Sequence, residues 1–124
     1  MEWVEDRGIE KRVRELGNAG KLEHVNPARV FCFRSLGAKT RAYARIWGLP
    51  RIFQQALGIQ PAYVIEVISE KFDKLPQEKQ DMVLIHELLH IPRTFSGALV
   101  PHHDRGGVNE DRVREIYKNL KVKK

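Results

Sequence analysis

The chain has 124 residues, 42% of them hydrophobic and 31% charged, which excludes a disordered chain and leaves room for one hydrophobic core. No apolar run approaches the roughly 18 residues that a membrane helix needs, and the N-terminus is charged, so we expect a cytoplasmic protein with no membrane partner. The net charge of +6 is dispersed except for a basic tail at residues 118–124, so nucleic acid is only a weakly supported partner.

Residues 1–20 are expected to form an N-terminal helix. Ile9, Val13 and Leu16 are spaced four and three residues apart, which places them on one helical face. Three β-branched or aromatic segments then predict strands, at residues 29–34, 40–47 and 62–68. A short helix is expected before the last of these strands, at residues 50–57. The single cysteine, Cys32, cannot form an internal disulfide and is expected to be a buried core residue.

The second half of the chain predicts two helices joined by a loop. A helix is expected from about 76 to 91, because Pro76 suits a first helical position and an apolar run follows it. Residues 93–107 contain several Gly and Pro residues and are expected to form a loop. Asn109 can then cap a last helix, whose apolar stripe is expected to pack on the core.

A His-Glu-x-x-His motif lies within the central predicted helix, at residues 86–90. His86 and His90 lie about 40° apart around the helix axis, so both imidazoles can reach one metal ion. Glu87 lies about 100° from His86, where it can take a proton from a metal-bound water without being a ligand. Because the neighbours of the motif are apolar, these polar groups are costly on this helix unless a metal ion pairs with them.

A hydrolytic zinc site usually has three protein ligands and one water, so a third ligand is needed. Arg93 and Ser96 occupy the positions at which a metzincin has Gly and His, which excludes that arrangement. The remaining candidates are His102 and His103 in the following loop and Glu110 at the start of the last helix.

The chain resembles the zincin metallopeptidases, and more closely the small single-domain metallopeptidases of archaea and phages. Three segments carry this resemblance: His-Glu-Leu-Leu-His-Ile-Pro at 86–92, Phe-Ser-Gly at 95–97 and Pro-His at 101–102. The resemblance implies a compact zincin-like α+β domain over residues 1–124. In such a domain a small mixed sheet of three or four strands packs against an active-site helix and a C-terminal helix. The active helix of these proteins follows an edge strand, which here is 62–68.

The resemblance also implies the site and its chemistry. It favours His102 over the other candidates, so that His86, His90 and His102 would bind one Zn²⁺ ion. Glu87 would be the catalytic general base in the hydrolysis of a peptide or protein substrate, which the edge strand would bind. Four further residues are unassigned candidates for stabilising the oxyanion: Tyr43, Tyr63, Arg93 and Arg105.

Two other functions remain open from the sequence. A metal-dependent endoribonuclease of the YbeY type also has two histidines four residues apart on a helix, and the positive net charge favours it. A catalytically silent zinc-binding domain would keep the ligands, although the intact Glu87 argues against lost turnover.

Overall fold

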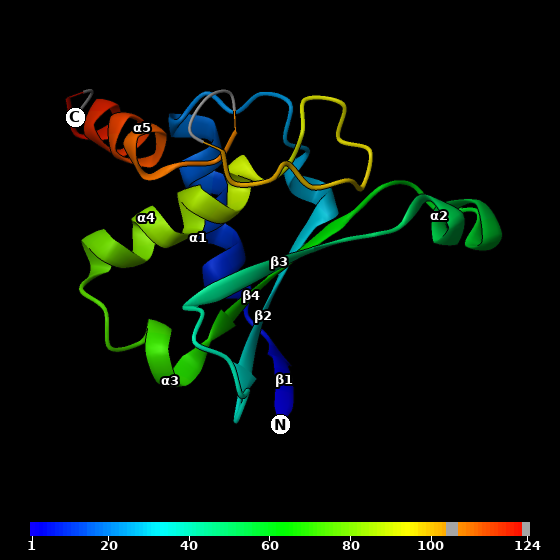
Figure 1. Ribbon diagram of the computed structural model, residues 1–124, viewed down its shortest axis with the longest axis horizontal. Helices are drawn as coiled ribbons and strands as arrows, with labels where there is room; N and C mark the ends of the chain where they lie inside the picture. Colours follow the sequence, from blue (N-terminus) through cyan, green and yellow to red (C-terminus); the bar gives the residue numbers. More distant parts are fainter. Residues whose placement is uncertain (104–106, 123–124) are drawn as a thin grey trace.

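The computed structural model describes residues 1–103 and 107–122 (Figure 1). It confirms the α+β class, with one four-stranded mixed sheet and helices of four to thirteen residues. The strands are β1 (Glu2–Glu5), β2 (Val30–Leu36), β3 (Ala44–Gly48) and β4 (Tyr63–Ile68). The helices are α1 (Arg7–Ala19), α2 (Arg51–Leu57), α3 (Ser69–Phe72), α4 (Gln77–Leu89) and α5 (Glu110–Val122), and a 3-10 turn at Pro27–Arg29 precedes β2.

The strands are arranged in the order β1-β2-β4-β3, with β2 and β4 parallel and the other neighbours antiparallel. The expectation that 62–68 is an edge strand is therefore wrong, because β4 has β2 on one side and β3 on the other. Strand order depends on pairing between distant segments, which the local sequence pattern does not contain. The edge strands are β1 and β3, and β3 contacts α4.

The expected helix at residues 1–20 is a strand followed by a helix. β1 pairs with β2 from Glu2 opposite Leu36 to Glu5 opposite Phe33. Asp6 then begins the helix, since its side chain accepts a hydrogen bond of 2.9 Å from the backbone N–H of Ile9. The predicted helical face is confirmed within α1.

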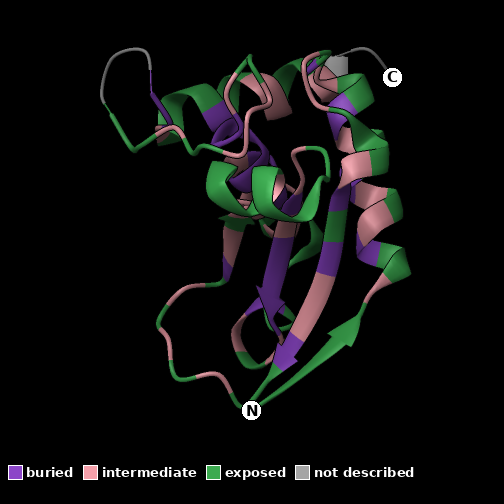
Figure 2. Cartoon of the chain, turned by 90° about the vertical axis from the view of Figure 1, so that its right-hand side faces the viewer, coloured by how far each residue is buried: buried purple, intermediate pink, exposed green. Residues whose placement is uncertain are grey.

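The core lies between the sheet and the helices on one of its faces. α1 contacts β2 and α4, and α5 packs on α4 (Figures 1 and 2). Ile65 of β4 and Leu84, Ile85 and Leu88 of α4 are fully buried, which makes α4 a central helix as predicted. Cys32 is buried as expected, and burial raises the pKa of its thiol to about 12, so the thiol is unreactive.

The remaining predicted helices are confirmed, with one addition. α2 ends at Gly58, which has a left-handed backbone (φ 64°) that favours glycine. The Asn109 side chain caps α5 by accepting a hydrogen bond from the N–H of Arg112 (2.9 Å). α3 was not expected. Most of the basic tail belongs to α5, while residues 123–124 lie outside the described residues. None of the helices described is long and apolar enough to cross a membrane.

The other face of the sheet carries a buried carboxylate that joins three strands. Glu66 of β4 is 1% exposed and accepts hydrogen bonds from Arg45 Nε (2.7 Å), Trp47 Nε1 (2.9 Å) and Trp3 Nε1 (3.1 Å). Burial opposes ionisation of Glu66, but these hydrogen bonds outweigh it and lower the pKa to about 2. The carboxylate therefore ties β1 and β3 to the central strand.

Candidate metal centre

Helix α4 holds the first two histidines of the motif in a fixed position. His86 lies in its last turn, and His90 directly follows Leu89 as the residue that ends the helix. The helix is anchored on α1 by Arg12, whose guanidinium donates hydrogen bonds to Asp81 (2.7 Å) and Gln80 (2.9 Å). Because α4 is also buried along Leu84, Ile85 and Leu88, the imidazoles project from a rigid element.

The loop after α4 folds back on the helix end and brings a third histidine to the first two. The N–H of Val100 donates a hydrogen bond of 2.7 Å to the carbonyl oxygen of His90. His102 then forms a parallel bridge with Val108, with hydrogen bonds from His103 N to Val108 O (3.1 Å) and from Val108 N to Pro101 O (3.2 Å). His102 is thus held by backbone contacts on both sides.

The first part of the same loop, residues 96–98, is fixed by close contacts with β4, α2 and the end of β3. The Tyr63 hydroxyl accepts a hydrogen bond from Gly97 N and donates one to Ala98 O, both 2.8 Å long. Gln54 Nε2 donates hydrogen bonds of 2.8 Å to Leu49 O and Ser96 O. A Cβ atom on Gly48 would lie 2.0 Å from Gly97 O, so the two backbones approach at a distance only glycine permits.

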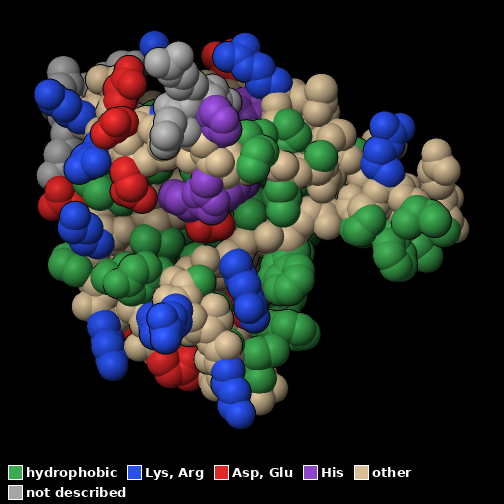
Figure 3. Space-filling view, viewed as in Figure 1, with side chains coloured by type: hydrophobic (Ala, Val, Ile, Leu, Met, Phe, Trp, Pro, Cys, Tyr) green, Lys and Arg blue, Asp and Glu red, His purple; other side chains and the backbone are tan. Residues whose placement is uncertain are grey.

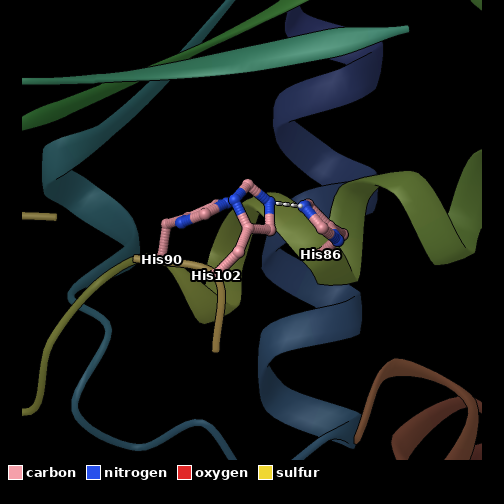
Figure 4. Close-up of side chains that lie close together, drawn as sticks. All are labelled: His86, His90 and His102. Carbon is pink, nitrogen blue, oxygen red and sulfur yellow. Dashed lines mark hydrogen bonds between the residues drawn. The ribbon is translucent and has the colours of Figure 1, made fainter. Parts of the chain in front are cut away.

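Three imidazoles converge at the end of α4 (Figure 4). One ligand atom each from His86, His90 and His102 lies within 4.8 Å of the others, and the Nε2 atoms of His86 and His102 are 2.9 Å apart. His90 Nδ1 lies 2.6 Å from Val100 O, and since a carbonyl oxygen only accepts, Nδ1 donates and Nε2 keeps its lone pair. Figure 3 shows that histidine side chains reach the surface on this face of the molecule.

The donor set fits a divalent metal ion. Two nitrogen ligands of one tetrahedral zinc lie about 3.3 Å apart. The ligand nitrogens of the three histidines span this distance, since the Nε2 atoms of His86 and His102 are 2.9 Å apart and all three ligand atoms lie within 4.8 Å of one another. Burial lowers the pKa of both His86 and His90, and for His86 the neighbouring histidines lower it further. Neutral imidazole is the form that binds a metal, so the surroundings favour the ligand form.

Glu87 is buried beside the histidines. Its side chain is 7% exposed, and burial raises the pKa of its carboxyl group to about 8. Glu87 and His86 line an open cleft of about 460 Å³ between α4 and the start of β3. The other residues that line the cleft are Tyr43, Ala44, Leu75, Lys79, Met82, Val83 and Glu110.

The other two candidates for a third ligand lie differently. Glu110 Oε1 is 3.8 Å from His86 Nδ1, on the opposite side of that ring from the nitrogen that faces His102. His103 uses its backbone N–H on Val108 and its carbonyl oxygen on the side chain of Asn109. Within the described residues, the group that could hold an ion includes His102 and neither of these two.

The candidates for stabilising an oxyanion are separated by the structure. Tyr43 is exposed and lines the cleft with Glu87, whereas Tyr63 is buried and its hydroxyl binds the loop. Arg93 lines a different cavity, next to His24 and Ile91. Arg105 lies outside the described residues.

Sequence reasoning did not identify the residues that position His102. Tyr63 and Gln54 hold the loop from two elements far from it in the chain, and no local pattern marks them. In the sequence, Gly48 stands at the end of the predicted strand 40–47 and Gly97 stands within the predicted loop. A glycine in such a place can indicate a close approach of two backbones, but it does not show which segment is the partner.

Comparison with known proteins identifies one family. Residues 1–121 match the family described as "Putative phage metallopeptidase". No curated protein and no solved structure gives a significant match. The match spans nearly the whole chain, including every residue of the histidine cluster.

Proposed function

The chain belongs to the phage metallopeptidase family, and we propose that it hydrolyses peptide bonds with one zinc ion held by His86, His90 and His102. The observation that carries this proposal is the convergence of three imidazoles beside a buried carboxyl group, Glu87. Zinc, when bound, would polarise the scissile carbonyl group and make a water molecule more acidic.

Glu87 is the general base of this proposal. Glu87 directly follows His86 in α4 and so lies beside the histidine cluster. A cation bound by the histidines would favour the ionised form of the Glu87 carboxyl group despite its burial. The carboxylate takes a proton from the attacking water and gives it to the nitrogen of the leaving amine.

The substrate would lie along β3 rather than along β4. β3 is an edge strand, and its first residue, Ala44, lines the cleft together with Glu87. An extended peptide can add to the edge of a sheet through backbone hydrogen bonds. The cleft therefore suits a peptide or protein substrate in extended conformation.

The test is hydrolysis of a mixed peptide library by protein loaded with one equivalent of zinc. Glu87→Gln should keep the metal and lower the hydrolysis rate by at least about 100-fold, the usual lower range for losing a general base. His86→Ala should lose both metal and activity. Cleavage by Glu87→Gln at the wild-type rate would eliminate the assignment of the base.

RNA is included in the same assay because an endoribonuclease was an open alternative. Cleavage of RNA with intact peptides would replace the proposed function by that alternative. Stoichiometric zinc binding with neither activity would identify a catalytically silent zinc-binding domain.

A further inference from the structure

The cleft continues well beyond the histidine cluster along one face of α4. Lys79, Met82, Val83 and His86 are spaced by three, one and three residues, so they lie on one helical stripe, and all four line the cleft. The opposite wall contains Tyr43, Ala44 at the start of β3, and Leu75 of the α3–α4 connection. The cleft thus has an axis that runs from His86 toward the start of α4.

The middle of the cleft is apolar. Four apolar residues line the cleft between Lys79 and His86: Met82 and Val83 of α4, Ala44 of β3 and Leu75 of the α3–α4 connection. An apolar wall binds a substrate side chain by excluding water, but does little to fix where the peptide ends or which charges it carries. Those properties depend on the two ends of the cleft.

The two ends of the cleft carry opposite charges. Glu110 lies at the histidine end, 3.8 Å from His86 Nδ1. Lys79 lies at the other end, exposed, and no hydrogen bond or ion pair to another described residue engages its ammonium group.

We propose that Lys79 binds a carboxylate of the peptide that occupies this cleft, which deepens the proposed function and rests on it for the nature of the ligand. Lys79 precedes His86 by seven residues, about 10 Å along the helix. An extended peptide covers about 3.4 Å per residue, so the carboxylate belongs about three residues from the scissile bond. Glu110 repels a carboxylate at the other end of the cleft, so the acidic group belongs at the Lys79 end.

Two groups of a peptide supply this chemistry, an acidic side chain or a free C-terminus. The first would make the protein an endopeptidase selective for acidic sequences, and the second would make it remove short fragments from C-termini. Both require the same contact with Lys79. Peptides that differ in one of the two groups distinguish them.

The experiment measures peptide binding by Glu87→Gln protein loaded with zinc, so that hydrolysis does not interfere. Hexapeptides carry Glu or Gln at each position in turn, with the C-terminus as free acid or amide. Lys79→Glu and Lys11→Glu are tested on this background, because Lys11 is an exposed lysine of α1 outside the cleft and the two changes alter net charge equally. Wild-type protein is assayed for cleavage of the same peptides.

We expect the carboxylate form to bind about fivefold more tightly than its neutral counterpart, the range of one exposed ion pair. Lys79→Glu should reverse this preference and Lys11→Glu should keep it. This result supports the contact even when wild-type protein cleaves nothing, in which case only the proposed function fails. Equal binding of both forms, or a preference that survives Lys79→Glu, overturns the contact even when peptides are cleaved. Absence of any peptide binding overturns both.

Discussion

His86 and His102 are sixteen residues apart in the chain, yet their Nε2 atoms lie 2.9 Å from each other. One nitrogen of such a pair must hold a proton, or a cation must lie between the two lone pairs. The backbone contacts of residues 100–103 impose this approach, because they fix His102 independently of the imidazoles. The fold therefore places two imidazole nitrogens next to each other.

His102→Ala should remove the third metal ligand. We expect zinc affinity to fall by more than about 100-fold, because loss of a ligand should exceed the 10–100-fold effect of a residue that only supports one. Glu110→Ala should stay within that lower range, since Glu110 faces the other nitrogen of His86. Competition with a chromophoric chelator measures both affinities.

His103→Ala is the matched control for that measurement, since it removes the adjacent imidazole of the same loop. Its zinc affinity should equal that of the wild type. A larger loss in Glu110→Ala than in His102→Ala would move the third ligand to the start of α5.

The extent to which the site follows from the sequence differs among its parts. His86, Glu87 and His90 share one helix, so helical geometry alone predicts their arrangement. The loop position of His102 has no periodicity, so spacing leaves three candidates and only the family resemblance favours His102. The backbone contacts of Val100 and Val108 bring His102 to the other two histidines, and a local pattern does not encode such long-range contacts.

Tyr63→Phe should destabilise the protein through the loop that carries His102. The substitution removes one hydroxyl group and leaves Gly97 N and Ala98 O without their partner. We expect the free energy of unfolding to fall by about 1–3 kcal/mol and zinc affinity to weaken in parallel. Chemical denaturation and zinc titration measure the two effects.

Tyr43→Phe serves as the comparison, because Tyr43 is exposed and lies in the cleft. Its stability should change by less than about 0.5 kcal/mol. Equal stability losses in the two variants would show that the Tyr63 hydroxyl does not hold the loop.

Gly48→Ala should be among the most damaging single-methyl additions in the chain. The new Cβ would lie 2.0 Å from Gly97 O, and the backbone on both sides is fixed by hydrogen bonds. We expect a loss of about 3 kcal/mol, the upper range for overpacking, together with weaker zinc binding. Gly17→Ala in α1 meets no atom within 4 Å and should raise stability by up to about 1 kcal/mol. Thermal unfolding that ranks the two variants in the opposite order would disprove the close approach.

The fold was predictable where one segment determines its own structure. Helix α4, strand β4 and the cap of α5 follow from spacing and turn residues. β1 was missed because four exposed residues have no buried face, and only pairing with β2 makes them a strand. The same dependence on a partner explains why β4 was expected at an edge and lies inside the sheet.

Glu66 should make stability depend on pH in acid. Its pKa is about 2 in the folded protein and about 4.5 in the unfolded chain, so its contribution is complete above pH 4.5 and is lost as the pH falls toward 2. A shift of this size corresponds to about 3 kcal/mol. Glu66→Gln should lower stability at pH 7, because Arg45 and two indoles lose their carboxylate, and should flatten the dependence between pH 4.5 and 2. Urea denaturation at pH 7, 4.5 and 3 measures both. Parallel curves for wild type and variant would mean that the hydrogen bonds to Glu66 do not stabilise its ionised form.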